Sequence, residues 1–206
     1  MSLVVKTSKS IAYNTLGKAV TIATNFIIFS HLMTKVNKDL YGISVIVLTF
    51  SGWLGILDIG VGAAVMKYVS EFNAGKEYVK LEKMFNTSLS FYTVIGIIIG
   101  FLLLILSFIY DRIFNINPDY IIQGRQLIYI CVVTSFFRWP LIPFYNALYG
   151  LNRFDIVNKV EILSNITRLI LVYLVFLFTN SFVLYVLISQ VFSVLYQVSY
   201  IFILKN

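Results

Sequence analysis

Charged side chains inside long apolar stretches are the residues of this chain best suited to chemistry. Asp58 lies within an apolar run that extends from Leu40 to Tyr68. A helix needs about 20 apolar residues to cross a bilayer, and this run is longer than that. An ionised residue inside such a helix costs about 2.5–3.5 kcal/mol on insertion scales. We therefore expect Asp58 to face a polar cavity or a charged partner rather than lipid.

Polar residues also recur at helical spacing in other apolar segments, so that each set shares one helix face. The first segment carries Asn14, Lys18, Thr21 and Asn25. The fifth carries Asn158, Glu161, Asn165 and Arg168, and the sixth carries Ser189, Ser193, Tyr196 and Tyr200. For the uncharged members two interpretations stay open. Either they form hydrogen bonds between helices, or they line a pathway.

The signs of the intramembrane charges indicate what such a pathway would accept. Arg138 lies about 18 Å into its segment, and Lys18 and Arg168 about 12 Å into theirs, at 1.5 Å per residue. The deep interior is therefore more positive than negative. Arginine binds phosphate through paired hydrogen bonds, so this cavity suits an anionic diphosphate better than a cationic drug. As an alternative, Asp58 only neutralises Lys18 or an arginine.

Six apolar segments of membrane length must position these residues. We place them at residues 10–33, 39–68, 85–109, 126–150, 160–178 and 182–204. Hydrophobic residues make up 59% of the chain and charged residues only 12%, about half of the usual ~25%. No linker divides the chain. We therefore expect an all-α transmembrane bundle with residues 1–206 in one domain.

The basic residues lie mostly in the short loops between these segments, which favours contact with lipid headgroups over nucleic acid. With the N-terminus inside, nine Lys and Arg residues fall on the cytoplasmic side and four on the other. This asymmetry predicts that both termini are cytoplasmic. With one Cys and one His in the chain, we expect neither a metal site nor a cofactor.

Small and cyclic residues suggest where the helices bend or approach one another. Pro140 and Pro143 interrupt the fourth segment, where each removes a backbone donor and favours a kink. Gly60 and Gly62 in the second segment favour close helix packing. Bending during transport is the alternative role for these glycines.

Three stretches resemble the polysaccharide-type, Wzx-like flippases of the multidrug/oligosaccharidyl-lipid/polysaccharide exporter superfamily. The first joins Leu40-Tyr41-Gly42, Leu57-Asp58-Ile59-Gly60 and Lys67-Tyr68-Val69-Ser70-Glu71. The second is Tyr149-Gly150-Leu151-Asn152-Arg153-Phe154 followed by Asn158, and the third is the polar start that leads into Lys18.

The resemblance implies a bacterial inner-membrane protein that moves polyprenyl-diphosphate-linked oligosaccharides by alternating access. Asp58 matches the acidic position in the family's second span. Depth and face, rather than a motif, make Arg138 and Arg168 candidates for the lumen, with Asn14, Lys18, Asn25 and Asn165 beside them. A multidrug exporter of the same superfamily is the nearest alternative. We expect no enzyme, because no catalytic cluster of His, Ser or carboxylates forms.

Family members have twelve or more spans, whereas six are predicted here. The chain therefore resembles one N-terminal lobe. It would be completed by a second lobe or by a second copy of itself, since parallel repeats build some transporters. A non-transporting scaffold or remnant is the remaining alternative.

Overall fold

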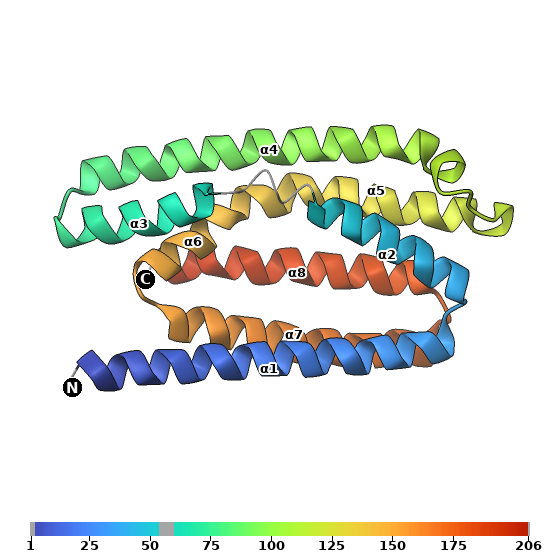
Figure 1. The fold of residues 1–206 in the computed structure, drawn as a ribbon, viewed down its shortest axis with the longest axis horizontal. Helices are drawn as coiled ribbons and strands as arrows, with labels where there is room; N and C mark the ends of the chain where they lie inside the picture. The colour runs from blue at the N-terminus through green and yellow to red at the C-terminus, as the bar shows by residue number, and fades with distance from the viewer. Residues whose placement is uncertain (1–2, 54–59, 206) are drawn as a thin grey trace.

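The computed structural model describes residues 3–53 and 60–205, and these form a bundle of long helices that run side by side (Figure 1). The α-helices are α1 (Leu3–Lys35), α2 (Lys38–Trp53), α3 (Val61–Ala74), α4 (Tyr78–Ile113), α5 (Ile121–Arg138), α6 (Ile142–Gly150), α7 (Phe154–Phe178) and α8 (Phe182–Lys205). Two short 3-10 helices, η2 (Pro118–Tyr120) and η3 (Trp139–Leu141), flank α5. The described residues contain no strand, so the predicted all-α fold is confirmed.

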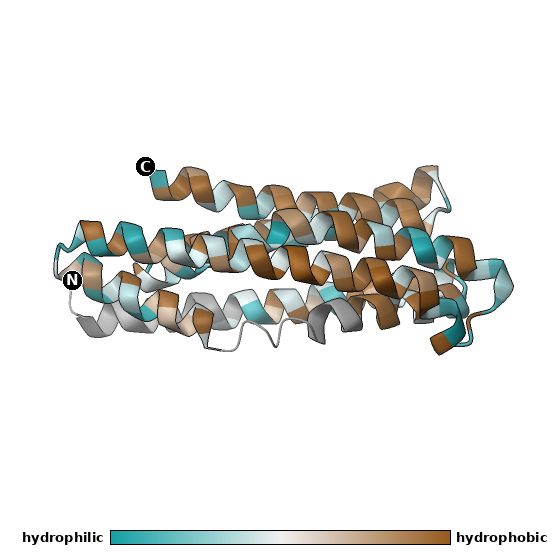
Figure 2. Ribbon diagram, turned by 90° about the horizontal axis from the view of Figure 1, so that it is seen from above, coloured by the Kyte–Doolittle hydropathy of each residue, from teal (hydrophilic) through white to brown (hydrophobic). Residues whose placement is uncertain are grey.

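Four stretches of the described chain are helical, long and apolar enough to cross a membrane: Tyr78–Ile113, Pro118–Gly150, Phe154–Phe178 and Phe182–Lys205. They contain the third to sixth predicted segments. The second predicted segment begins in α2 and ends in α3, and Asp58 falls between them, outside the described residues. Polar residues gather toward the helix ends and apolar residues dominate between them (Figure 2). The total of six spans and the single domain stay predictions.

The helices pack in a defined order across the bundle. Helices α3 and α4 lie along one side, α1 and α7 along the opposite side, and α5, α6 and α8 between them, with both chain ends at the same end of the bundle (Figure 1). Glycines allow the closest approaches. A Cβ atom on Gly96 of α4 would lie 2.9 Å from the Cβ of Trp139, which no real structure tolerates without movement.

The fourth predicted segment is broken in its middle. Helix α5 ends at Arg138, η3 turns through Pro140, and α6 begins at Ile142 with Pro143 in its first turn. Proline lacks a backbone N–H and its ring clashes with the preceding turn, so the α-helical ladder stops here. The predicted kink is confirmed, and it leaves Arg138 at the break.

A tight turn then reverses the chain from α6 into α7. The Arg153 N–H donates to the Leu148 carbonyl at 2.9 Å, and Asn152 takes the left-handed conformation with φ 57°. This is the hydrogen-bond pattern of a glycine-type helix C-terminus, in which asparagine also serves. The turn fixes where α7 begins and hence the height of Asn158 and Glu161 in the bundle.

Candidate functional site

A cavity of about 690 Å³ opens among α1, the α5–α6 break, α7 and α8. Its lining is mainly polar side chains and tyrosines, with a few aliphatic residues. The polar and aromatic members are Lys18, Thr21, Arg138, Tyr145, Asn146, Glu161, Ser164, Asn165, Ser193, Tyr196, Gln197 and Tyr200. They come from four regions of the sequence that only the folded bundle brings together.

The polar faces of α1 and α7 meet each other along one wall of this cavity. Asn165 Nδ2 donates to Thr21 Oγ1 at 2.8 Å, and one turn farther along α7 the Arg168 guanidinium donates to Asn25 Oδ1. A hydrogen bond between membrane helices is worth about 0.6 kcal/mol on average. Part of each predicted polar face therefore joins the two helices.

Two charged members of the same two faces point into the cavity. Lys18 lies three residues before Thr21, and Glu161 four residues before Asn165, and both line the open space. Neither forms an ion pair within 4 Å in the part of the chain that the structure describes, where the ion pair found is Lys80–Glu77. Both side chains are thus placed to meet a ligand.

The α5–α6 break supplies the opposite wall. Arg138, Ile142, Tyr145 and Asn146 all line the cavity, and they follow steps of four, three and one along the interrupted segment. Asn146 Nδ2 donates to Tyr92 Oη at 3.4 Å, which ties this wall to α4. Discontinuous helices line the substrate sites of many transporters.

A cluster of three tyrosines lies beside the carboxylate at one end of the cavity. Tyr145 Oη donates to Glu161 Oε1 at 3.4 Å. The Tyr145 ring centroid lies 4.8 Å from that of Tyr149 and 5.8 Å from that of Tyr200. Such rings offer an apolar face with a polar tip. This end can therefore hold a ligand that is both hydroxylated and partly apolar.

Helix α8 closes the third side. Tyr196 exchanges a 2.6 Å hydrogen bond with Thr167 of α7. The Oε1 atom of Gln197 is buried without a hydrogen-bond partner among the described residues, and Gln197 lines the cavity. A buried polar atom without a partner is costly, so this amide is available to a ligand or a water.

The charges of the cavity favour an anion. Lys18 and Arg138 are cationic and Glu161 is the carboxylate among the described lining residues. One net positive charge in a space of low dielectric constant attracts phosphate more strongly than the same charge in water would. The guanidinium adds a planar pair of donors that matches phosphate oxygens.

The predicted site residues fall into three groups. Lys18, Arg138 and Asn165 line the cavity. Asn25 and Arg168 bind each other instead. Asp58, together with the side chain of Asn14, lies outside the described residues, so the role predicted for each stays a prediction.

Sequence reasoning missed four of the polar and aromatic lining residues. Tyr145, Asn146, Ser164 and Gln197 were in none of the predicted polar faces. Tyr145 and Asn146 follow Arg138 at helical spacing beyond the prolines, and that continuation is the signal that could have found them. Gln197 adjoins Tyr196 of the sixth polar face.

Comparison with known proteins gives one match. A family model described as MatE matches residues 17–174, which is more than half of the chain and runs from α1 into α7. No curated protein and no solved structure gives a significant match. The matched region contains Lys18, Arg138, Tyr145 and Glu161, and the members of this family are membrane transporters. The chain belongs to the MatE family of the multidrug/oligosaccharidyl-lipid/polysaccharide exporter superfamily.

Proposed function

We propose that this chain forms part of a flippase that moves polyprenyl-diphosphate-linked oligosaccharides across a bacterial inner membrane. The observation that carries the proposal is the charge of the cavity. Lys18 and Arg138 face one carboxylate, Glu161, among the described lining residues. A diphosphate meets two cations there, and its charge compensates theirs.

The rest of the lining suits the sugar that such a substrate carries. Tyr145, Tyr196 and Tyr200 present ring faces and hydroxyl groups, and Asn146 and Gln197 present amides. Sugar rings offer C–H faces and many hydroxyls, so they use both kinds of group. The isoprenoid tail would remain in the lipid beside the open cavity.

A multidrug exporter is the second candidate, and one observation favours it. The Glu161 carboxylate accepts a hydrogen bond from Tyr145, whose ring packs against those of Tyr149 and Tyr200. An aromatic cation binds well to both a carboxylate and a ring face. Arg138 and Lys18 in the same cavity oppose this role, because they repel a cation.

Export measurements in a bacterium that depends on the chain separate the two. We expect Arg138→Gln and Lys18→Gln each to lower surface glycan about 10-fold or more, since a charge-assisted hydrogen bond contributes about 1.5–3 kcal/mol. Efflux of a cationic dye should not change. Arg153→Gln is the matched control, because Arg153 is exposed in the α6–α7 turn and does not line the cavity.

Three results would contradict the proposal. Normal glycan export by both Arg138→Gln and Lys18→Gln would show that export does not need these cations. Dye efflux that fails in Glu161→Gln would favour the multidrug exporter. A gene deletion that changes neither glycan nor efflux would identify a non-transporting protein.

A further inference from the structure

A second, separate groove lies between α3 and α4, on the side of the bundle opposite α1 and α7. It has a volume of about 450 Å³, and its floor is formed by Val61, Ala64, Val65 and Met84. Thr87 and Ser88 also line it, but their hydroxyls donate to backbone carbonyls of α4, so the floor is mainly apolar, unlike the lining of the polar cavity. Its shape and chemistry fit a hydrocarbon chain.

One end of the groove carries lysines and aromatic rings. Tyr68 and Phe72 of α3 stack with their centroids 5.6 Å apart, and the Lys80 ammonium lies 6.0 Å from the Phe72 ring. Lys80 is neutralised by Glu77, whose Oε2 atom is 2.6 Å away. Lys83 lines the groove, is exposed, and has no ion pair among residues 3–53 and 60–205.

A third lysine stands close to the same rings. The Lys67 ammonium lies 5.4 Å from the Tyr68 ring. Glu71 and Glu82 are the other carboxylates at this end of the two helices, and neither they nor Lys67 line the groove. Lys83 therefore supplies the positive charge in the groove lining, and Lys67 adds a second one beside Tyr68.

The groove lies where α4 passes from polar to apolar surroundings. The exposed residues of α4 are polar or charged from Lys80 to Ser90, and apolar from Phe91 to Ile109. The helix has 36 residues, about 54 Å at 1.5 Å per residue, so it extends well beyond a hydrocarbon core of about 30 Å. Lysines and tyrosines at this level belong to the headgroup region.

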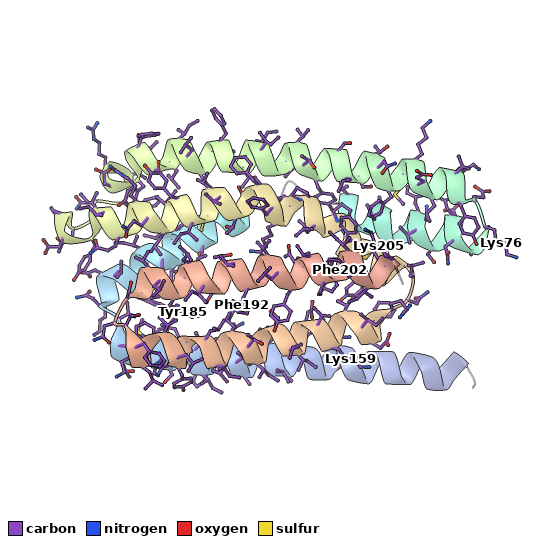
Figure 3. All side chains as sticks on the ribbon, turned by 180° about the vertical axis from the view of Figure 1, so that it is seen from behind. Lys76, Lys159, Tyr185, Phe192, Phe202 and Lys205 are labelled. Carbon is purple, nitrogen blue, oxygen red and sulfur yellow. The ribbon has the colours of Figure 1, made fainter. Side chains whose placement is uncertain are left out.

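We propose that the α3–α4 groove binds an anionic phospholipid. One acyl chain occupies the apolar floor, and the headgroup phosphate lies at Lys83 and Lys67. The lysines favour an anionic lipid, because a zwitterionic headgroup would be attracted to them less strongly. The apolar floor favours a lipid over a soluble phosphate, because a phosphate would leave the floor unfilled. Figure 3 labels Lys76 at the turn between α3 and α4, four residues before Lys80 of the groove lining.

Native mass spectrometry of the full chain in mild detergent tests this with an equimolar mixture of phosphatidylglycerol and phosphatidylcholine. We expect preferential retention of phosphatidylglycerol. Lys83→Gln should reduce that retention about fivefold, as expected for one lysine near an anionic headgroup. Lys159→Gln is the control, since this exposed lysine lies on α7 in the same half of the bundle, away from the groove (Figure 3).

A second pair of variants tests the apolar floor. Ala64→Phe should fill the groove and displace the lipid, whereas Ala63→Phe should not, because Ala63 is exposed beside it and does not line it. Both variants should remain monodisperse.

Four results would overturn the proposal. The first is equal retention of the two lipids, and the second is unchanged retention in both Lys83→Gln and Ala64→Phe. The third is that inorganic phosphate protects the chain against unfolding as well as phosphatidylglycerol does. The fourth is a dimer that Ala64→Phe dissociates and Ala63→Phe does not. The last would identify the groove as an interface between two copies.

Discussion

Polar side chains in this bundle hold helices together, face the cavity, or do both. Thr21 and Asn165 bond each other and also line the cavity, whereas Lys18 and Glu161 place their charges in it. All four lie on the polar faces of α1 and α7. One helical face can therefore carry both roles, because residues three or four apart differ slightly in direction and so meet different neighbours.

A double-mutant cycle measures the first role. Asn165→Leu and Thr21→Val should each destabilise the chain, with a coupling free energy of about 0.6 kcal/mol between them. The Thr21 hydroxyl also donates to the Gly17 carbonyl at 2.9 Å. The free energy lost in Thr21→Val therefore includes this second hydrogen bond. Unfolding in mixed micelles measures the free energies. A coupling of zero would mean that this hydrogen bond does not join α1 to α7.

At the scale of the elements, glycines decide how closely helices approach. A Cβ on Gly150 of α6 would lie 2.6 Å from the Met66 carbonyl oxygen and 2.8 Å from the Val69 Cβ. The carbonyl is backbone and cannot turn aside, so α3 and α6 would have to separate. A Cβ atom on Gly42 of α2 would have no neighbouring atom within 4 Å.

These two glycines predict substitutions of opposite sign. Gly150→Ala should destabilise the chain by about 1–3 kcal/mol through overpacking. Gly42→Ala should stabilise it by up to about 1 kcal/mol, because alanine is the better helix former. Thermal unfolding in detergent compares both with the unsubstituted chain. Equal effects of the two substitutions would contradict the close contact between α3 and α6.

The helices show how far sequence reasoning reaches. Length and hydropathy were enough to predict the stretches that became α4, α5 with α6, α7 and α8, and Pro140 marked the break. Spacing also predicted which residues share a face. It did not identify the partner of each face, because periodicity describes one helix and says nothing of its neighbour. The Arg168–Asn25 contact could not be anticipated for that reason.

On the scale of the whole molecule, basic residues concentrate at one end of the bundle. Lys76, Lys159 and Lys205 lie in the half that contains both chain ends (Figure 3). Cytoplasmic loops carry an excess of Lys and Arg. We propose that this end, with both termini, faces the cytoplasm.

Cysteine labelling in intact cells checks the orientation. Cys131 is buried, so background labelling by a membrane-impermeant maleimide should be low. Asn180→Cys, in the turn between α7 and α8, should react from outside, whereas Lys76→Cys should react only after the membrane is opened. The reverse pattern would invert the proposed topology.

Binding of a radiolabelled polyprenyl diphosphate to the purified chain is the measurement that tests the central claim most directly. We expect saturable binding that a cationic dye does not displace. Lys18→Gln and Arg138→Gln together should weaken it about 100-fold or more, if each cation contributes about 1.5–3 kcal/mol. Arg153→Gln should bind as the unsubstituted chain does. Undiminished binding by the double variant, or displacement by the dye, would contradict an anion site built on Lys18 and Arg138.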